Sequence, residues 1–449
     1  KLFSMLIRTI SGVRGLTISH LTPGTALHYA RALHELLPTG VIIAGRDSRP
    51  SGEDIIQAMV AQLTRLGRTV LHCGIVPTPT VQFMVHRTEA VGGFIVTASH
   101  NPVEWNGIKF VGENSTFFPA GDCERLFELV DAENDPPDAD EMGIVWPERN
   151  AIQKHVIACA GLKCIDLNRI QRRNFRIVID AVNGAGAHAL PAMLESLGCE
   201  VIELNCEPDG QFTRGTEPLP ENLSGLCDAV MENDADGGFA VDPDADRLAV
   251  VNEKGEPLGE EYSLVLAADG YLNEVGETEV FVTNLSTSLA LDKLAESKGS
   301  SVVRSAVGEI NVVNKMNELG SKLGGEGNGG VILREAHLGR DSLVAATMVL
   351  NRMSQSSEPL SEIHLSLPQF EIVKDKVNLE GIDPDELIKK ACTLFDDAEK
   401  NTLDGIKFTW IDRWVHLRKS NTEPIMRIYA EGPYREDAQK LIEKVESCI

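Results

Sequence analysis

Short apolar runs, separated by stretches with helical spacing of apolar residues, recur along most of the chain. Val41–Ala44 and Val91–Val96 are runs bounded by polar turns, which is typical of buried strands. Thr22 followed by Pro23 predicts a helix start, and a second helix is expected from Ser51 to Gly67. A strand, a helix and a strand in this order predict a βαβ unit with a parallel sheet.

A weak internal repeat extends this prediction. Three glycines at predicted helix ends are each followed three residues later by Val, in the stretches 67–70, 198–201 and 299–302. A helix-capping glycine before a strand also arises by chance in α/β proteins. We nevertheless expect three similar α/β units, the second beginning with the strand 175–180 and the third with the strand 279–282.

The last part of the chain has a different pattern. A helix begins near Pro384, strands are expected at 405–410, 414–418 and 425–431, and a closing helix at 435–447. Strands that follow one another without crossover helices indicate an α+β module. With linkers in the polar stretches between units, the predicted domains are 1–148, 149–253, 254–362 and 363–449.

Composition and charge exclude some classes of partner. The 449 residues carry a net charge of −25, which argues against nucleic acid and anionic membranes because both bind Lys/Arg-rich surfaces. A local cationic site for phosphate remains compatible with this charge. No apolar run approaches the roughly 18 residues of a membrane span, and the first residues contain no signal cleavage site. The nine cysteines are scattered without a C-x-x-C pair, so we expect free thiols and a cytoplasmic protein.

The stretch Thr97–Pro102 combines a hydroxyl and an imidazole directly after a predicted buried strand. Ligands of open α/β sheets bind at the carboxyl ends of strands, so Ser99 is expected to point into a crevice. Ser99 and His100 alone are weak evidence for a nucleophile and base, because neighbours on an extended segment point to opposite faces. A polar turn is the alternative.

Asp242-Pro243-Asp244-Ala245-Asp246-Arg247 follows another apolar run and alternates three carboxylates with other residues. Such acids converge on an oxygen-binding cation, and Mg²⁺ is the expected one. An EF-hand is excluded, because Arg247 occupies the position of its glycine and an apolar strand follows. A phosphatase-type aspartyl nucleophile and a solvated acidic turn remain alternatives.

Two further segments suggest substrate contacts. Gly324–Gly330 contains a literal G-x-G-x-x-G, but a strand-like run follows it, so it does not form a dinucleotide site. Its Glu326 and Asn328 could instead bind sugar hydroxyls. The turn Arg418–Pro424, with Arg427, concentrates the cations and neutral donors that a phosphate dianion needs. A flexible glycine turn and a solvated basic turn are the respective alternatives.

Phosphoryl transfer on a sugar phosphate explains the serine loop, the acidic loop and these two segments together, with serine as the carrier of the phosphoryl group.

These four motifs, in this order, resemble the α-D-phosphohexomutase superfamily. The resemblance implies an α/β fold of three topologically similar domains with mixed sheets and a smaller C-terminal α+β domain around a central cleft. It implies that Ser99 is a phosphoserine and binds Mg²⁺ together with Asp242, Asp244 and Asp246. It further implies catalytic roles for Arg14, His100, Lys109 and Arg247, and substrate binding by Arg46, Glu326, Asn328, Arg418, Ser420, Asn421, Thr422 and Arg427.

The family reaction interconverts hexose 6-phosphate and hexose 1-phosphate through a hexose 1,6-bisphosphate, which also serves as activator. Several branches have a His where this chain has Gly330, and the form Gly-Gly-Glu-x-Asn-Gly-Gly resembles the archaeal-type phosphoglucosamine mutase branch. We therefore expect glucosamine phosphate as the substrate, with phosphomannose and phosphoglucose as the alternatives. A metal-assisted sugar-phosphate phosphatase and a non-catalytic sugar-phosphate sensor are the rival classes.

Overall fold

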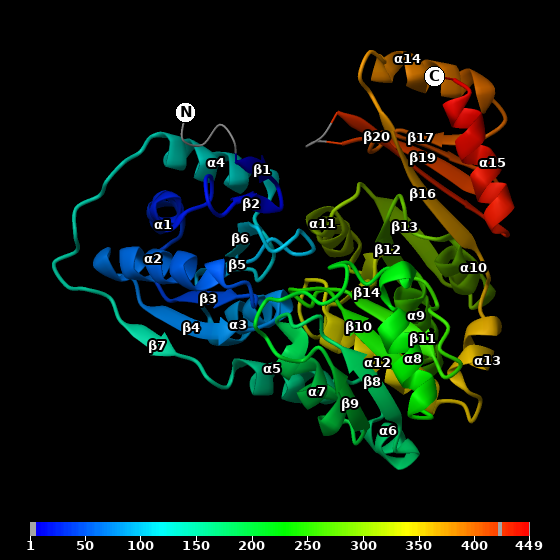
Figure 1. The fold of residues 1–449 in the computed structure, drawn as a ribbon, viewed down its shortest axis with the longest axis horizontal. Helices are drawn as coiled ribbons and strands as arrows, with labels where there is room; N and C mark the ends of the chain where they lie inside the picture. Colours follow the sequence, from blue (N-terminus) through cyan, green and yellow to red (C-terminus); the bar gives the residue numbers. More distant parts are fainter. Residues whose placement is uncertain (1–5, 421–423, 449) are drawn as a thin grey trace. The chain divides into compact units, whose positions relative to one another are not determined.

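The computed structural model describes residues 6–420 and 424–448 (Figure 1). The chain forms two compact units. The first contains the residues up to Val275 together with Gly329–Ile363, and the second contains Gly276–Asn328 and the residues from His364 onward. Asn421 and Thr422, two of the predicted phosphate-binding residues, lie outside the described residues.

The first unit begins with a seven-stranded mixed sheet of order β1-β2-β6-β5-β3-β4-β7. Strand β3 is parallel to β4 and β5, whereas β6 is antiparallel to β5. Its strands are β1 Ile7–Thr9, β2 Gly12–Leu16, β3 Ile42–Arg46, β4 Val70–Ile75, β5 Gly92–Val96, β6 Trp105–Gly112 and β7 Val145–Pro147. Its helices are α1 Pro23–Leu36, α2 Ser51–Arg65, α3 Thr78–Thr88 and α4 Ala120–Asp131.

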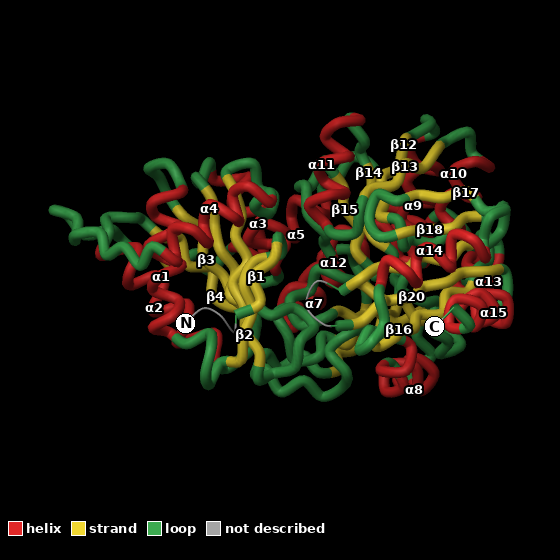
Figure 2. Tube along the Cα trace, turned by 90° about the horizontal axis from the view of Figure 1, so that it is seen from above, coloured by secondary structure: helices red, strands yellow, loops and turns green. Residues whose placement is uncertain are grey.

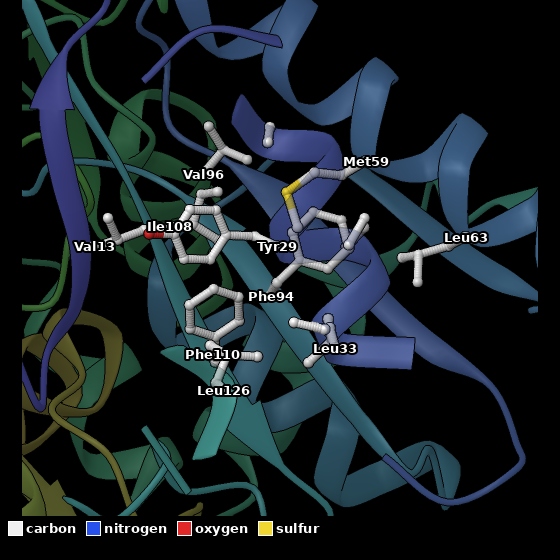
Figure 3. Packing of buried hydrophobic residues seen from close by; sticks show 14 of the residues in the cluster. Val13, Tyr29, Leu33, Met59, Leu63, Phe94, Val96, Ile108, Phe110 and Leu126 are labelled. Atoms are coloured by element: carbon white, nitrogen blue, oxygen red, sulfur yellow. The ribbon is translucent and has the colours of Figure 1, made fainter. Parts of the chain in front are cut away.

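Apolar side chains from this sheet and its helices form one core (Figure 3). Tyr29 and Leu33 of α1 meet Phe94 of β5 and Phe110 of β6, and the rings of Tyr29 and Phe110 stack with centroids 6.1 Å apart. The predicted cap of α1 is confirmed, because the Thr22 side chain accepts a hydrogen bond from the Thr25 amide. This core holds the end of β5, from which the Ser99 loop emerges.

A second sheet of the first unit has the order β11-β10-β8-β9, with β8 parallel to β9 and β10 and with β11 antiparallel to β10. Its strands are β8 Arg176–Asp180, β9 Glu200–Leu204, β10 Gly237–Val241 and β11 Leu248–Asn252. The helices of this part are α5 Ala151–Ala160, α6 Leu167–Arg173, α7 Gly186–Ser196, a 3-10 turn η1 Pro220–Asn222 and α8 Ser224–Glu232. The unit also contains α9 Tyr262–Val275, β15 Gly330–Leu333 and α12 Ser342–Ser354, and α13 Leu360–Leu365 follows.

The second unit contains one group of parallel strands and one antiparallel sheet. Strand β12 is parallel to β13 and β14. This part consists of β12 Val280–Asn284, α10 Leu289–Ser297, β13 Ser301–Ser305, α11 Glu309–Leu319 and β14 Leu323–Glu326. The predicted tail module is confirmed as α+β, with α14 and α15 beside an antiparallel sheet of order β16-β20-β19-β18-β17 (Figure 1). Its elements are β16 Glu371–Asn378, α14 Pro384–Leu394, β17 Glu399–Asn401, β18 Ile406–Thr409, β19 Trp414–Lys419, β20 Ile425–Gly432 and α15 Arg435–Glu446.

The three predicted α/β units share one topology. The orders β4-β3-β5, β9-β8-β10 and β13-β12-β14 are equivalent, and strands alternate with helices along the chain in each unit. Figure 2 shows the helices in red and the strands in yellow. The three repeated glycines have φ values of 80°, 80° and 71°. In each case the glycine amide and the next amide bond back to carbonyls of the preceding helix. The repeat therefore marks the same left-handed helix cap in all three units.

Two further features concern the cysteines and the helices. All nine cysteines are free, as expected. Among the residues that the structure describes, no helix has the length and apolar character needed to cross a membrane.

Candidate functional site

The serine loop leaves β5 in a tight turn that places Ser99 in the left-handed region, at φ 51°. This conformation is unfavourable for a residue with a side chain, so it needs support from its surroundings. The Ser99 amide donates to Thr97 Oγ1 at 2.9 Å, and Thr97 Oγ1 donates to Asp47 Oδ2 at 2.6 Å. Arg49, which is fully buried, donates to the Ser99 carbonyl at 2.8 Å. The loop is therefore held rigidly.

The Ser99 hydroxyl is buried, with only 2% of the residue exposed. Its Oγ lies 3.3 Å from His100 Nδ1 and 3.5 Å from Asp242 Oδ2. The expectation that Ser99 and His100 would point to opposite faces holds for an extended segment, but the turn at Ser99 brings the two side chains together. The structure thus places a hydroxyl between a possible base and an acidic loop.

The acidic loop connects β10 to β11, and its three aspartates are fully buried. One oxygen from each of Asp242, Asp244 and Asp246 lies within 4.8 Å of the others. Asp242 Oδ1 accepts the amides of Asp246 and Arg247, but Oδ1 of Asp244 and Oδ1 of Asp246 have no hydrogen-bond partner within the described part of the chain. Buried, unpaired carboxylate oxygens fit a hard divalent cation, so a solvated acidic turn is excluded.

Two cations accompany the triad. Lys109, on β6, places Nζ 2.6 Å from Asp244 Oδ2 and 3.7 Å from Asp246 Oδ2. Arg340 donates to Asp246 Oδ2 at 2.6 Å. Burial tends to raise the Asp244 pKa, but the charge and hydrogen bond of Lys109 and the Thr78 hydroxyl leave it lowered. Asp242 lacks such a partner, and its pKa is raised well above the usual value by burial and by the other two aspartates.

His100 is held as a neutral imidazole. Its pKa is lowered well below the usual value, first by burial and then by the charges of Arg247 and Arg14. Arg247 Nη2 lies 3.3 Å from His100 Nδ1, and a guanidinium can only donate, so Nδ1 carries the lone pair. The same nitrogen faces Ser99 Oγ and can accept its proton.

Sequence reasoning missed several residues of this site. Glu217 accepts from Arg247 Nη1 at 3.0 Å and lies 3.8 Å from His100 Nε2, while Thr216 donates to the His100 carbonyl. Both lie in the loop between β9 and η1, which contains no recognisable motif. No sequence motif identified Arg340. Arg49 lies in the short connection between β3 and α2.

Arg14, predicted to be catalytic, joins the serine loop by donating to Asn101 Oδ1 at 2.9 Å. The described residues predicted to bind substrate fall in both units, and Arg46 in the first unit pairs with Glu53. In the second unit, Glu326 is buried and accepts from Asn284 Nδ2 at 2.7 Å and from the Gly308 amide at 2.9 Å. Asn328 follows Glu326 in the same unit.

The predicted phosphate-binding turn also belongs to the second unit. Arg418 and Arg427 are direct partners in the β19–β20 register, and Arg418 donates to Asp404 at 2.8 Å. Ser420 follows β19. The structure therefore groups Ser99, His100, Lys109, Arg14, Arg247 and the acidic triad in one unit. The remaining candidates that it describes, apart from Arg46, lie in the other unit.

Comparison with known proteins identifies the family. Residues 6–136, 154–255 and 259–370 match the alpha/beta/alpha domains I, II and III of phosphoglucomutase/phosphomannomutase, and residues 376–447 match its C-terminal domain. The chain belongs to the phosphoglucomutase/phosphomannomutase family. It is accordingly a phosphohexomutase, an isomerase with the four-domain architecture of the family.

Individual members of the family cover nearly the whole chain. A probable phosphoglucosamine mutase of Methanopyrus kandleri is 35% identical and covers 98% of this chain and 97% of its own length. A phosphoglucomutase/phosphomannomutase of Thermococcus kodakarensis is also 35% identical, with 96% of both chains covered. Among solved structures, a putative phosphomannomutase of Thermus thermophilus superposes with a TM-score of 0.84 at 24% identity, covering 99% of both chains.

A more distant member of the fold was solved with ligands. This N-acetylphosphoglucosamine mutase of Aspergillus fumigatus, in complex with GlcNAc-6P and magnesium, has a TM-score of 0.61 at 14% identity and covers 100% of this chain and 96% of its own. At that identity the likeness concerns the fold alone. In this chain the buried acidic triad is a potential metal site on its own geometry.

Proposed function

We propose that this phosphohexomutase carries the phosphoryl group on Ser99 and converts hexose 6-phosphate to hexose 1-phosphate through hexose 1,6-bisphosphate. The observation that carries this proposal is the position of Ser99 Oγ, which is buried 3.3 Å from His100 Nδ1 and 3.5 Å from Asp242 Oδ2. A hydroxyl next to a neutral base and a cation-binding loop is equipped to act as a nucleophile.

Ser99, Asp242, Asp244 and Asp246 would hold Mg²⁺. The donor set supports a hard cation, because it consists of oxygens alone and two of them lack hydrogen-bond partners among the described residues. When bound, the ion would neutralise charge on the phosphoryl oxygens during transfer.

Proton transfer falls to His100 and Lys109 in this account. When Ser99 takes back the phosphoryl group, its hydroxyl proton passes to His100 Nδ1 as the bond between phosphorus and the sugar oxygen breaks. The sugar oxygen then needs a proton, for which Lys109 Nζ is the proposed donor. In the opposite half-reaction both protons return along the same routes.

Arg14 and Arg247 would supply positive charge beside the transferred group. Arg14 contacts Asn101 of the serine loop, and Arg247 lies between His100 and Glu217. Guanidinium groups suit this role because they stay charged when buried and donate several hydrogen bonds.

The second unit and Arg46 would bind the substrate. Arg418 and Arg427 occupy opposite positions on adjacent strands, and Arg418 also pairs with Asp404. Two neighbouring guanidinium groups can donate several charge-assisted hydrogen bonds to one phosphate. This supports binding of the non-reacting phosphate by Arg418, Arg427 and Ser420, with Asn421 and Thr422 as further donors. Glu326 and Asn328 would bind sugar hydroxyls.

The preferred substrate is proposed to be glucosamine phosphate. The reaction is proposed to take place in the cytoplasm. Relatives named probable phosphoglucosamine mutase and the glycine-rich form of the loop at 324–330 support this choice. Phosphomannose and phosphoglucose are the second candidates, because a relative of equal identity is named phosphoglucomutase/phosphomannomutase.

Phosphorus NMR of one reaction series tests the proposal. The protein with Mg²⁺ and a trace of hexose 1,6-bisphosphate is given glucosamine, glucose or mannose 6-phosphate in turn, and Ser99→Ala serves as control. Formation of the 1-phosphate, fastest with glucosamine and absent in the variant, is the expected result. Release of inorganic phosphate alone would indicate a phosphatase, and no change with any sugar would favour a sensor.

A further inference from the structure

A second cluster of metal-ligating side chains lies in the first unit, apart from the acidic triad. His155 and Cys159 are one turn apart on the same face of α5, and Asp341 is the N-cap of α12. One ligand atom from each of the three lies within 4.8 Å of the others. None of the three is exposed, and nearby His337 is 2% exposed.

The ring of His155 lies between Thr80 and Asp341. Its Nε2 lies 2.8 Å from Asp341 Oδ2, but within the described ranges it forms no hydrogen bond of regular geometry. The other ring nitrogen, Nδ1, is 3.0 Å from Thr80 Oγ1. The ring also stacks on Phe83, with centroids 4.6 Å apart.

This arrangement resembles the environment of a metal-bound imidazole. Ligating histidines commonly bond their second nitrogen to a neighbouring acceptor, which fixes the ring and leaves the first nitrogen with its lone pair. Thr80 can accept Nδ1–H in this way. Asp341 is supported similarly, because Oδ1 caps the amides of Leu343 and Val344 and leaves Oδ2 facing His155 and His337.

We propose that His155, Cys159 and Asp341 bind a zinc-type divalent transition ion in the interior of the first unit. Nitrogen and sulfur ligands select zinc over magnesium, which separates this cluster from the all-oxygen triad. His337 does not belong to this group of ligand atoms, and its Nε2 lies 2.9 Å from Asp341 Oδ2 as a hydrogen-bond partner. A thiolate and a carboxylate together balance the charge of a divalent ion, so the buried site would be electrically neutral.

Binding at this site involves the Cys159 thiol proton. Coordination requires the thiolate and therefore releases a proton, which makes the affinity fall as the pH is lowered.

The site would act on the catalytic loop through α12. Arg340 bonds to Asp246, and Ser342 donates to the Ala245 carbonyl at 2.7 Å, so both neighbours of Asp341 contact the acidic loop. An ion that ties Asp341 to α5 would hold these contacts in place. Its role is structural, since none of its ligands touches Ser99 in the described contacts.

Cobalt and zinc titrations test this inference. Full-length protein is stripped with a chelator, transferred to excess MgCl₂ so that the acidic triad is saturated, and titrated with CoCl₂ and then ZnCl₂. We expect about one cobalt ion per chain with a near-ultraviolet thiolate-to-metal band, which zinc then displaces. Cys159→Ser should abolish the band. Cys123→Ser, which alters another buried thiol of the same unit, should keep it.

Thr80→Val provides a second variant that leaves all ligands in place. It should weaken zinc binding roughly 10- to 100-fold, because the partner of His155 Nδ1 is lost. A thiolate band that is missing in the wild-type protein, or that survives Cys159→Ser, would overturn the inference and leave a buried hydrogen-bonded network. The wild-type titration decides this even where a variant fails to fold.

Discussion

Buried positive and negative side chains surround the Ser99 hydroxyl. The three carboxylates of the triad differ in how close their nearest cation lies. Lys109 and Arg340 each approach one carboxylate of the triad to 2.6 Å, whereas the nearest cation to Asp242 is Arg247, with Nε at 3.9 Å. Asp242 is also the aspartate next to Ser99. Asp242, the carboxylate of the triad with the most distant cation, is therefore the one that lies beside the proposed nucleophile.

At the scale of single residues, the first prediction concerns Glu217. Glu217→Gln removes the charge that holds Arg247 and faces His100 Nε2, so the His100 pKa should fall further and both side chains should lose their fixed positions. We expect kcat to drop roughly 10- to 100-fold with little change in KM. Steady-state kinetics across pH would measure this.

Glu221→Gln is the matched control, because Glu221 is an exposed carboxylate a few residues further along the same segment. It should behave like the wild type. Equal activity of the two variants would show that Glu217 is not a positioning residue.

Among single residues, those in contiguous motifs could be predicted from sequence. Ser99 and the three aspartates lie in short loops whose chemistry can be read from neighbouring residues. Glu217 and Arg340 could not be found in this way, because the fold brings them to Arg247 and Asp246 from distant segments. The same applies to the turn at Ser99, since a serine rarely adopts a positive φ and no local pattern indicated it.

At the scale of elements, the repeated left-handed cap ends α2, α7 and α10 in the same way. We predict that Gly198→Ala lowers the free energy of unfolding by about 1 kcal/mol, because alanine at φ 80° is strained. Gly225→Ala, within α8 and with open space where the added methyl group would lie, should instead stabilise by about 0.5 to 1 kcal/mol. Urea denaturation measures both, and equal effects would contradict the proposed role of the cap.

A second element-scale prediction concerns pH and β19. Burial lowers the pKa of His416 from 6.5 to about 4, and the ring bonds to Ser286 and to the Asp404 carbonyl. Between these values the unfolded chain binds the proton and the folded unit does not, so stability falls as the pH falls from 6.5 toward 4. The expected slope is on the order of 1 kcal/mol per pH unit.

His416→Gln, which keeps a donor and an acceptor, should flatten this slope in urea denaturation at a series of pH values. A variant with the same slope as the wild type would assign the effect to other groups.

At the scale of the whole molecule, the net charge of −25 includes three buried aspartates that a cation would stabilise. We predict that Mg²⁺ raises the stability of the first unit by about 2.7 kcal/mol when its concentration is 100 times its dissociation constant. Thermal unfolding with increasing MgCl₂ measures this, with NaCl at equal ionic strength as the control for general screening.

Asp244→Asn should greatly reduce the response to Mg²⁺. A shift of equal size with NaCl, or in this variant, would contradict a specific metal site at the triad.

The overall architecture was predictable because βαβ units leave a strong signature of apolar runs and capping glycines. The structure confirms three similar α/β units and an α+β module. The strands that were not predicted are β1, β2, β6, β7, β14, β16 and β17. Of these, β16 is largely polar and only partly buried, and β17 is short and exposed. The boundaries of the predicted domains remain predictions.

The central claim is that Ser99 carries the phosphoryl group, and a labelling and chase experiment tests it most directly. The protein is phosphorylated with labelled hexose 1,6-bisphosphate, the site is located by peptide mass spectrometry, and unlabelled hexose 6-phosphate is added. The account predicts label on Ser99, its transfer to the sugar within a turnover, and no labelling of Ser99→Ala. Label on another residue, or label that leaves Ser99 only as inorganic phosphate, would contradict the account.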